Sequence, residues 1–305
     1  MYVRPAAAAA AAFLGFTLTL LGGTASHAAT GTGSATGTGT AGRAALGGPV
    51  VYAHRGASAY APENTLDAID LAMQMGFDWV ENDVQRTKDG VLVVIHDDTL
   101  ARTTDVEQRF PDRAPWKVKD FTWAEISVLD AGSWFGGEYA GASVPSLRQY
   151  LDRVQRNRQR LLLEIKKPEL YLGIEEQTLK VLDEAGWLDP RHVAQRLVVQ
   201  SFSADSVRIV HGLRPDLVTA FLGTPTVADL PRYAEFTDRI NPWHTTISAE
   251  WVSAVHGLRG AHGKAMEVDT WIVDDAATAR KVQAMGVDGI ITNAPDVVQD
   301  AVGGF

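Results

Sequence analysis

The 305-residue sequence contains no cysteine, which excludes disulfide bonds, thiolate metal sites and cysteine-linked lipid anchors. It also lacks a run of basic residues, since 28 Lys and Arg stand against 37 Asp and Glu for a formal net charge of −9. A net-acidic chain without a basic cluster is a poor candidate for general nucleic-acid binding. A local cationic pocket for a phosphate is compatible with this balance.

Long hydrophobic runs are also scarce. The apolar run at residues 6–21 is short for a membrane span, and it lies between Arg4 and the small residues of TASHAAT. This order predicts a secretory signal peptide over residues 1–29, cleaved near Ala28 or Ala29. We therefore expect a secreted protein, extracellular or periplasmic, without stable membrane insertion.

Residues 30–48 consist almost entirely of Gly, Thr, Ala and Ser, which predicts a flexible linker because such a segment buries little apolar surface. Residues 49–305 are long enough for one domain with a large core. Because no disulfide is available, that domain must depend on its core or on a bound metal.

Short apolar runs alternate with helical patterns along residues 49–305. Eight runs predict strands, at 50–54, 79–84, 161–165, 197–201, 217–222, 239–243, 266–271 and 289–292. Helical patterns lie between them, at 64–75, 146–157, 173–185, 203–211, 226–236, 248–257 and 275–285. This alternation predicts a (β/α)8 barrel of the TIM type. A further strand at 91–96 and a segment at 99–145, rich in Trp, Gly and Pro, predict a small inserted lobe.

The stretch ENDVQRTKDGVLVVIHD, residues 81–97, carries two acids two positions apart. Side chains alternate along a strand, so Glu81 and Asp83 share a face. Asp89-Gly90 predicts a two-residue hairpin turn, whose register would place His96 directly opposite Asp83. The alternative is an ordinary surface hairpin with solvated charged ends.

Two further strand ends carry polar residues. His54 and Arg55 follow the first strand, where His suits proton transfer and Arg suits phosphate binding. The alternative is a His that caps the strand and an Arg in a surface ion pair. Glu164 and Lys166 share a face at the end of another strand, either as a structural ion pair or as site residues. Trp271 ends a strand at the same rim, either as the wall of a pocket or as a core residue. Asn64 is the predicted N-cap of the first helix.

The carboxyl ends of barrel strands meet on one face, so these residues should converge. Glu81, Asp83 and Glu164, in a chain without Cys, predict a site for one hard divalent cation, Ca²⁺ or Mg²⁺. His54 and His96 then remain as an acid/base pair. Together with the positive charge of Arg55 and Lys166, this set predicts chemistry on a phosphoester.

The motifs AHRGASAYAPENTLDAI, ENDVQRTKDGVLVVIHD, LLLEIKKP and DGIITNAPD, in this order, resemble the glycerophosphodiester phosphodiesterases. The resemblance runs from about Val50 onward. It implies a phosphodiesterase-type TIM barrel that hydrolyses a small-molecule glycerophosphodiester to glycerol 3-phosphate and an alcohol. The mechanism proposed for the family has a glycerol hydroxyl attack phosphorus to give a cyclic phosphate, which water then opens.

Carried over by motif position, the resemblance assigns the same roles to individual residues. It makes His54 and His96 the catalytic acid/base pair, places the cation on Glu81, Asp83 and Glu164, and gives substrate binding to Arg55, Lys166 and Trp271. The chain departs from the family pattern at three positions, Asn82, Asp274 and Asn293. Asn82 should face outward with little effect on ligation. Asp274 and Asn293 bear on fine substrate preference.

Two other functions remain open from the sequence. One is a phospholipase D-like enzyme that acts on lysophospholipid or sphingomyelin through a related barrel, against which the 99–145 insertion argues. The other is a non-catalytic protein that binds phosphate-bearing ligands, which would need cations but not two proton carriers.

Overall fold

The computed structural model describes residues 48–303. The predicted signal peptide and all but the last residue of the predicted linker lie outside the described residues. Among the described residues, no helix is both long enough and apolar enough to cross a membrane.

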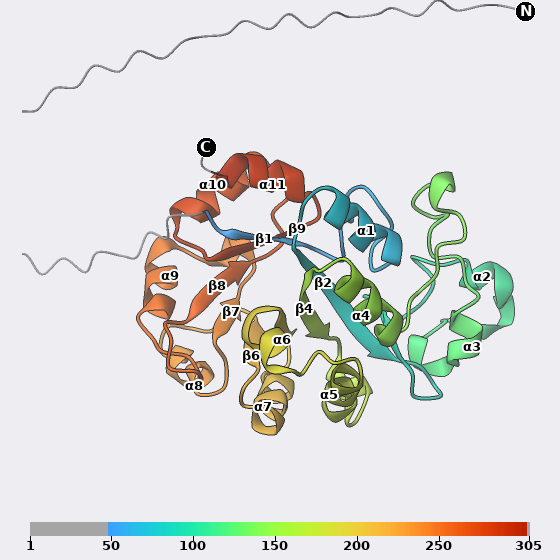
Figure 1. The fold of residues 1–305 in the computed structure, drawn as a ribbon, viewed down its shortest axis with the longest axis horizontal. Coiled ribbons are helices and arrows are strands. Elements are labelled where there is room, and N and C mark those ends of the chain that lie inside the picture. The colour runs from blue at the N-terminus through green and yellow to red at the C-terminus, as the bar shows by residue number, and fades with distance from the viewer. Residues whose placement is uncertain (1–47, 304–305) are drawn as a thin grey trace, which may run out of the picture. The chain divides into compact units, whose positions relative to one another are not determined.

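Eight parallel strands form a closed barrel (Figure 1). They are β1 (Val50–Ala53), β2 (Trp79–Arg86), β4 (Arg160–Ile165), β5 (Leu197–Ser201), β6 (Val218–Leu222), β7 (Arg239–Asn241), β8 (Glu267–Thr270) and β9 (Gly289–Thr292). Each strand pairs with its neighbours, and β1 closes the ring by pairing with both β9 and β2. The predicted (β/α)8 barrel is confirmed, with each of the eight predicted strands within two residues of its expected ends.

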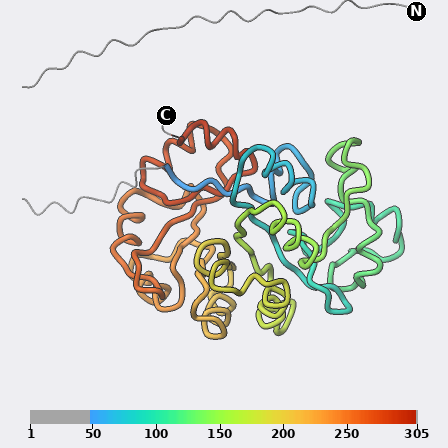
Figure 2. Tube along the Cα trace, in the orientation of Figure 1, coloured from blue at the N-terminus to red at the C-terminus, as the bar shows by residue number. Residues whose placement is uncertain are grey.

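Helices surround the barrel, as the Cα trace shows (Figure 2). Seven correspond to predicted helices: α1 (Leu66–Gln74), α4 (Leu147–Arg156), α5 (Ile174–Glu184), α7 (Ala204–Leu213), α8 (Leu230–Ala234), α9 (Ala249–His256) and α10 (Ala276–Ala284). Two more, α6 (Pro190–Gln195) and α11 (Pro295–Val302), were not predicted from the sequence. Both begin with Pro at the first helical position, where its missing N–H costs nothing.

Strand alternation divides the core into two layers. One set of strand residues packs with the helices in a large apolar cluster. The opposite set fills the barrel interior: Tyr52, Trp79, Leu162, Val198, Ala220 and Ile291. The interior is therefore a packed plug, and only the strand ends above it can form a pocket.

The strand β3 (Leu92–Val94) runs antiparallel to β2 in a hairpin, but its register differs from the prediction by one residue. Val84 lies opposite Val94, and the N–H of Ile95 donates to the carbonyl of Asp83 at 3.0 Å. The predicted pairing of Asp83 with His96 is wrong. The loop has three residues, 88–90, because Gly90 adopts the left-handed conformation (φ +86°) that closes such loops.

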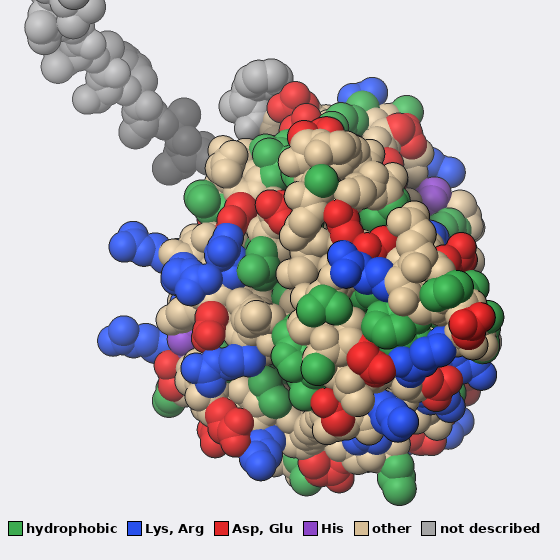
Figure 3. Space-filling view, turned by 90° about the vertical axis from the view of Figure 1, so that its right-hand side faces the viewer, with side chains coloured by type: hydrophobic (Ala, Val, Ile, Leu, Met, Phe, Trp, Pro, Cys, Tyr) green, Lys and Arg blue, Asp and Glu red, His purple; other side chains and the backbone are tan. Residues whose placement is uncertain are grey.

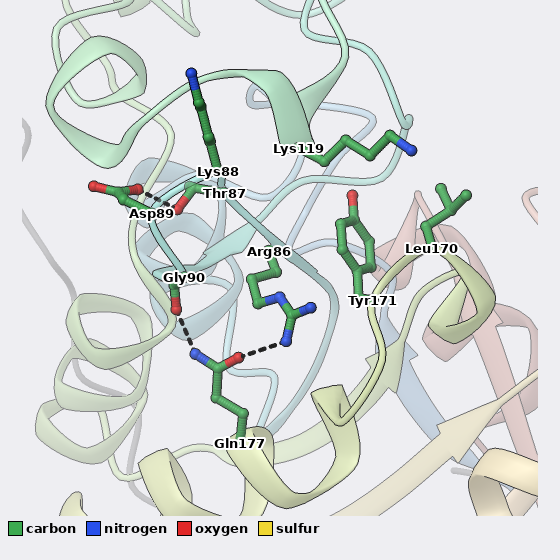
Figure 4. Close-up of a pocket in the computed structure, with 9 residues that line it drawn as sticks. All are labelled: Arg86, Thr87, Lys88, Asp89, Gly90, Lys119, Leu170, Tyr171 and Gln177. Atoms are coloured by element: carbon green, nitrogen blue, oxygen red, sulfur yellow. Dashed lines mark hydrogen bonds between the residues drawn. The ribbon is translucent and has the colours of Figure 1, made fainter.

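The hairpin loop is anchored to α5 (Figure 4). The Gln177 side chain donates to the carbonyl of Gly90 and accepts from Arg86, which also donates to the carbonyl of Leu172 at 3.1 Å. A cavity of about 480 Å³ opens beside these contacts. Figure 4 shows Lys119 pointing away from Arg86 and Gln177. Because the hydrogen bonds of Gln177 and Arg86 join the loop to its neighbours, we interpret this region as an anchor for the hairpin.

Residues 99–145 form the lobe beside the barrel, in green at the right of Figure 1. It contains two short helices, α2 (Val106–Arg109) and α3 (Trp123–Ile126). Five short 3-10 segments lie in the lobe and the barrel loops, at Pro111–Arg113, Val118–Asp120, Gly137–Tyr139, Pro168–Leu170 and His244–Thr246. The lobe has its own apolar cluster, which includes Leu100, Phe121 and Ile126 and packs on Val93 and Ile95 of the returning hairpin strand.

We predict that Gly289→Ala destabilises the barrel. A Cβ at this position would lie 2.2 Å from Asp269 Oδ1 and 2.6 Å from Tyr52 Cε2, and forcing volume into a packed core costs about 1–3 kcal/mol. Urea unfolding measures the free energy of unfolding. The matched control is Gly212→Ala in α7, where a Cβ meets no atom within 4 Å. Equal stability of the two variants would contradict the prediction.

Candidate active site

One pocket lies at the carboxyl ends of the strands and collects almost every candidate residue. Seven of the eight line it: His54, Arg55, Glu81, His96, Glu164, Lys166 and Trp271. The eighth, Asp83, is 1% exposed and lies 3.0 Å from Arg55 Nε and 3.4 Å from Lys166 Nζ. The structure thus brings the whole predicted set together.

Glu81, Asp83 and Glu164 form a group that could hold a metal ion. One carboxylate oxygen of each lies within 4.8 Å of the others. Two buried oxygens, Asp83 Oδ1 and Glu164 Oε1, are paired only with Lys166 Nζ, at 3.4 and 2.9 Å, and accept no further hydrogen bond from the described residues. A hard cation requires donors that are all oxygen, with acceptor capacity left over, so the residues fit such an ion.

The three carboxyls differ in pKa, because burial and the neighbouring charges affect each one differently. Burial raises the pKa of Glu81, and the nearby Asp83 carboxylate raises it further. Burial and Asp83 raise the pKa of Glu164 to about 7. Burial also opposes ionisation of Asp83, but Arg55 and Lys166 outweigh it and hold the pKa of Asp83 below its usual range. Without an ion, the site therefore favours one ionised carboxylate over three.

Arg55 is fixed by its own backbone as well as by its charge. It adopts a left-handed conformation (φ 55°) that is costly for a residue with a side chain. Its N–H donates to Glu81 Oε2 at 3.1 Å, and its guanidinium donates to Glu63 at 2.9 Å. The strained turn therefore places a guanidinium beside the carboxylates.

His54 is 8% exposed, and its two ring nitrogens have different surroundings. Nδ1 lies 2.7 Å from Asn293 Oδ1, whereas Nε2 lies 3.8 Å from Glu81 Oε2. Burial, assisted by Arg55, lowers the pKa of His54 to about 3. The imidazole is therefore neutral near pH 7, with one nitrogen directed at the carboxylates.

His96 has a carboxylate partner instead. Its Nδ1 lies 2.7 Å from Asp97 Oδ1, and Arg102 holds both oxygens of Asp97 at 2.7 and 3.0 Å. Arg102 also donates to both oxygens of Glu63, which binds Arg55. Burial lowers the pKa of His96. A continuous chain of ion pairs therefore links Arg55 to the second histidine.

His96 is held at the pocket by hydrogen bonds from the Gln85 side chain and not by strand pairing. Gln85 is fully buried, and its amide nitrogen lies 2.6–3.0 Å from the carbonyls of Ile95, His96 and Asp97. The chain curls around this amide after β3 ends. Strand alternation places Gln85 on the same face as Glu81 and Asp83, which is a signal that could have identified it.

Asn64 is a site residue and not the helix cap. The N-cap of α1 is Thr65, whose side chain accepts from the N–H of Ala68, so the predicted cap is wrong by one residue. Asn64 adopts a left-handed conformation (φ 61°), and its amide donates to Asp83 Oδ2 at 2.9 Å. It is 3% exposed and helps to satisfy a buried carboxylate.

Apart from Gln200, the rest of the pocket lining is apolar and aromatic. Trp271 is fixed by a hydrogen bond from its indole to the carbonyl of Asn241 at 2.8 Å. Phe202 and Trp243 pack edge-on against it, at ring distances of 5.4 and 4.8 Å. Both are exposed, at 50% and 40%, and neither was predicted from the sequence. This wall offers a surface for the uncharged part of a ligand.

The three departures noted in the sequence lie in different places. Asn82 is fully buried and alternates away from Glu81 and Asp83, so the outward face on which it was expected is covered. Its amide makes no hydrogen bond to the described residues, and nothing in the structure explains this. Asn293 and Asp274 are bonded to each other at the pocket rim, at 2.7 Å.

The fold and the site define a class. A barrel whose strand ends carry two histidines, three carboxylates and two cations is the arrangement of a phosphoric diester hydrolase. The model of the glycerophosphoryl diester phosphodiesterase family matches residues 54–297. The chain belongs to this family.

Known relatives support the assignment along most of the chain. A glycerophosphodiester phosphodiesterase of Bacillus subtilis is 34% identical over 267 residues, covering 83% of this chain and 86% of the relative. One of Caldanaerobacter subterraneus is 34% identical over 263 residues, covering 83% and 97%. The solved structure of an Oleispira antarctica phosphodiesterase, in complex with its product sn-glycerol-3-phosphate, has a TM-score of 0.69 and 29% identity, covering 83% and 96%.

We predict that Gln85→Leu lowers kcat by about 100-fold, because misplacing a catalytic group by about 1 Å has this effect. The variant removes the donor that holds the three carbonyls around His96. Steady-state hydrolysis of glycerophosphocholine measures the loss. Gln195→Leu, on the exposed end of α6, is the control. An unchanged kcat in Gln85→Leu would show that His96 is positioned by other contacts.

Proposed function

We propose that the chain is a secreted, metal-dependent hydrolase that cleaves glycerophosphodiesters to glycerol 3-phosphate and an alcohol. The observation that carries the proposal is the convergence in one pocket of two histidines, three buried carboxylates and two cations. A protein that only binds phosphate needs the cations but not two histidines whose Nδ1 atoms are both anchored.

Arg55 and Lys166 would hold the phosphate of the substrate. Both lie against Asp83, so their charge is shared with a buried carboxylate, and both also line the open pocket. Trp271 would pack against the uncharged part of the substrate. The glycerol hydroxyl next to the phosphate would then lie between the two histidines.

The two histidines would move the protons. With Nδ1 bonded to an amide oxygen, His54 presents Nε2 as a proton acceptor for the attacking glycerol hydroxyl. His96, supported by Asp97, would donate a proton to the oxygen of the departing alcohol. When water opens the resulting cyclic phosphate, the two roles reverse.

Glu81, Asp83 and Glu164 would hold one divalent cation, Ca²⁺ or Mg²⁺, because their donors are all oxygen. When bound, the ion would stabilise the negative charge that develops on the phosphoryl oxygens. It would also offset the repulsion among the three carboxylates, which burial makes costly.

Secretion is proposed from the order of charged, apolar and small residues over positions 1–29. Amino-terminal sequencing of protein from the culture medium or periplasm tests it. A first residue immediately after Ala28 or Ala29 is expected, and retention of intact chain inside the cell would contradict it.

We predict that the chain releases glycerol 3-phosphate from glycerophosphocholine and that EDTA abolishes the release. His54→Ala and His96→Ala should each lower kcat by about 10²–10⁴-fold, the usual contribution of a general acid or base. The control is His211→Ala, on α7 away from the pocket. Undiminished turnover in EDTA contradicts the metal role, and full activity in either variant contradicts the acid/base role.

We predict that ionisation of Glu164 removes stability from the metal-free protein as the pH rises from about 5 to 7. The effect is measured against Glu164→Gln, because the lowered pKa values of His54 and His96 act in the opposite direction in both proteins. The pKa of Glu164 rises from 4.5 to about 7 on folding because of burial and Asp83. The folded state thus binds this proton more tightly, and its stabilising effect is present below pH 4.5 and lost as the pH approaches 7.

Scanning calorimetry in EDTA at pH 5 and 8 measures this effect through Tm. Excess Mg²⁺ should raise Tm more at pH 8 than at pH 5, because the ion requires ionised carboxylates. The Tm of the unchanged chain minus that of Glu164→Gln should be smaller at pH 8 than at pH 5, and Glu164→Gln should show a smaller metal effect. A Tm that is unaffected by metal at pH 8 would contradict the assignment.

A further inference from the structure

Two residues outside the predicted site lie one behind the other beside His54, and only the first of them contacts it. Asn293 follows β9 and places its Oδ1 2.7 Å from His54 Nδ1. Asp274, which follows β8, lies behind Asn293 and accepts from its Nδ2 at 2.7 Å. Sequence reasoning connected these two positions only with substrate preference.

The chemistry of Asp274 determines which way the Asn293 amide faces. A carboxylate only accepts hydrogen bonds, so the NH₂ group of Asn293 must face Asp274. The amide oxygen must then face His54. Because that oxygen can only accept, His54 Nδ1 must carry a hydrogen, and Nε2 is left free to accept a proton in the pocket.

Further hydrogen bonds fix the positions of Asp274, Asn293 and His54. Asp274 Oδ1 also accepts from the N–H of Asn293 at 2.7 Å and from Thr292 Oγ1 at 3.0 Å. Ser58 Oγ donates to Asn293 Oδ1 at 2.7 Å. The N–H of His54 donates to the carbonyl of Thr292 at 2.8 Å, so the ends of β1 and β9 are joined beside the pair.

The partner of His54 differs in charge from the partner of His96. His96 Nδ1 lies directly against the carboxylate of Asp97. His54 Nδ1 instead meets a neutral amide, with the carboxylate of Asp274 one side chain further away. The Nδ1 atoms of the two histidines therefore have partners of different charge, and exchanging one partner for the other would change the charge beside the ring.

We propose that Asn293 and Asp274 form a positioning pair that fixes the ring orientation and the Nδ1–H tautomer of His54. The proposal rests on the proposed role of His54 in hydrolysis. The order of the pair, amide toward the histidine and carboxylate behind it, sets the direction of each hydrogen bond. Neither residue is assigned a contact with the substrate.

An exchange of the two side chains tests the pair. Asn293→Asp alone would place two carboxylates where a 2.7 Å hydrogen bond now lies. Combining it with Asp274→Asn restores an acceptor toward His54 and a donor–acceptor contact behind it. Asn293→Ala removes the partner altogether. The matched control is Asp296→Asn, which removes the charge of the carboxylate that accepts from Tyr60 but does not reach His54.

The kinetic result should separate kcat from KM. Loss of a partner behind a functional side chain typically costs about 10–100-fold in activity, so kcat of Asn293→Ala and of Asn293→Asp should fall by that factor. KM should stay within about twofold, because neither position is assigned a substrate contact. The double variant should regain about tenfold over Asn293→Asp, and Asp296→Asn should match the unchanged chain. A wild-type kcat in Asn293→Ala, or a double variant no better than Asn293→Asp, would overturn the proposal.

A second measurement does not depend on activity. Nitrogen-15 NMR of labelled histidine should show His54 as the Nδ1–H tautomer in the unchanged chain and a shift toward Nε2–H in Asn293→Ala. An Nε2–H tautomer in the unchanged chain would overturn the proposal. If the unchanged chain releases no glycerol 3-phosphate, the proposed function fails, and the tautomer result still decides the positioning role.

Discussion

The structure depends on one electrostatic constraint, which is that three carboxylates are buried within 4.8 Å of one another. Charges of one sign at this distance in a region of low dielectric are unfavourable without compensation. Arg55 and Lys166 compensate mainly Asp83, whose pKa falls, whereas burial raises the pKa of Glu81 and Glu164. The remaining deficit of positive charge is the physical reason to expect a divalent cation.

The fold meets this constraint by separating the packed interior from the site. Large apolar residues, among them Tyr52 and Trp79, fill the lower barrel, so the strand ends are held rigidly above them. The lobe packs against Val93 and Ile95 and secures the hairpin that returns His96. The ion-pair chain through Glu63 and Arg102 then ties the hairpin to the turn that bears Arg55.

Periodicity in the sequence was enough to predict the barrel and the convergence of the site, because strand ends in a closed parallel barrel meet on one face. Finer features depended on one backbone conformation each. The left-handed Gly90 adds a residue to the loop and shifts the register, so His96 arrives through Gln85. Asn64 likewise belongs to the site because its backbone turns left-handed. The periodicity of apolar residues in the sequence does not predict left-handed backbone conformations at single residues.

The central claim is that Glu81, Asp83 and Glu164 create a need for one bound cation. Titration calorimetry of the EDTA-treated, dialysed chain with Mg²⁺ and with Ca²⁺ tests it most directly. We expect one ion per chain for at least one of the two, and loss of binding in the Asp83→Asn/Glu164→Gln double variant. An absence of binding for both ions, or binding that persists in the double variant, would contradict the account.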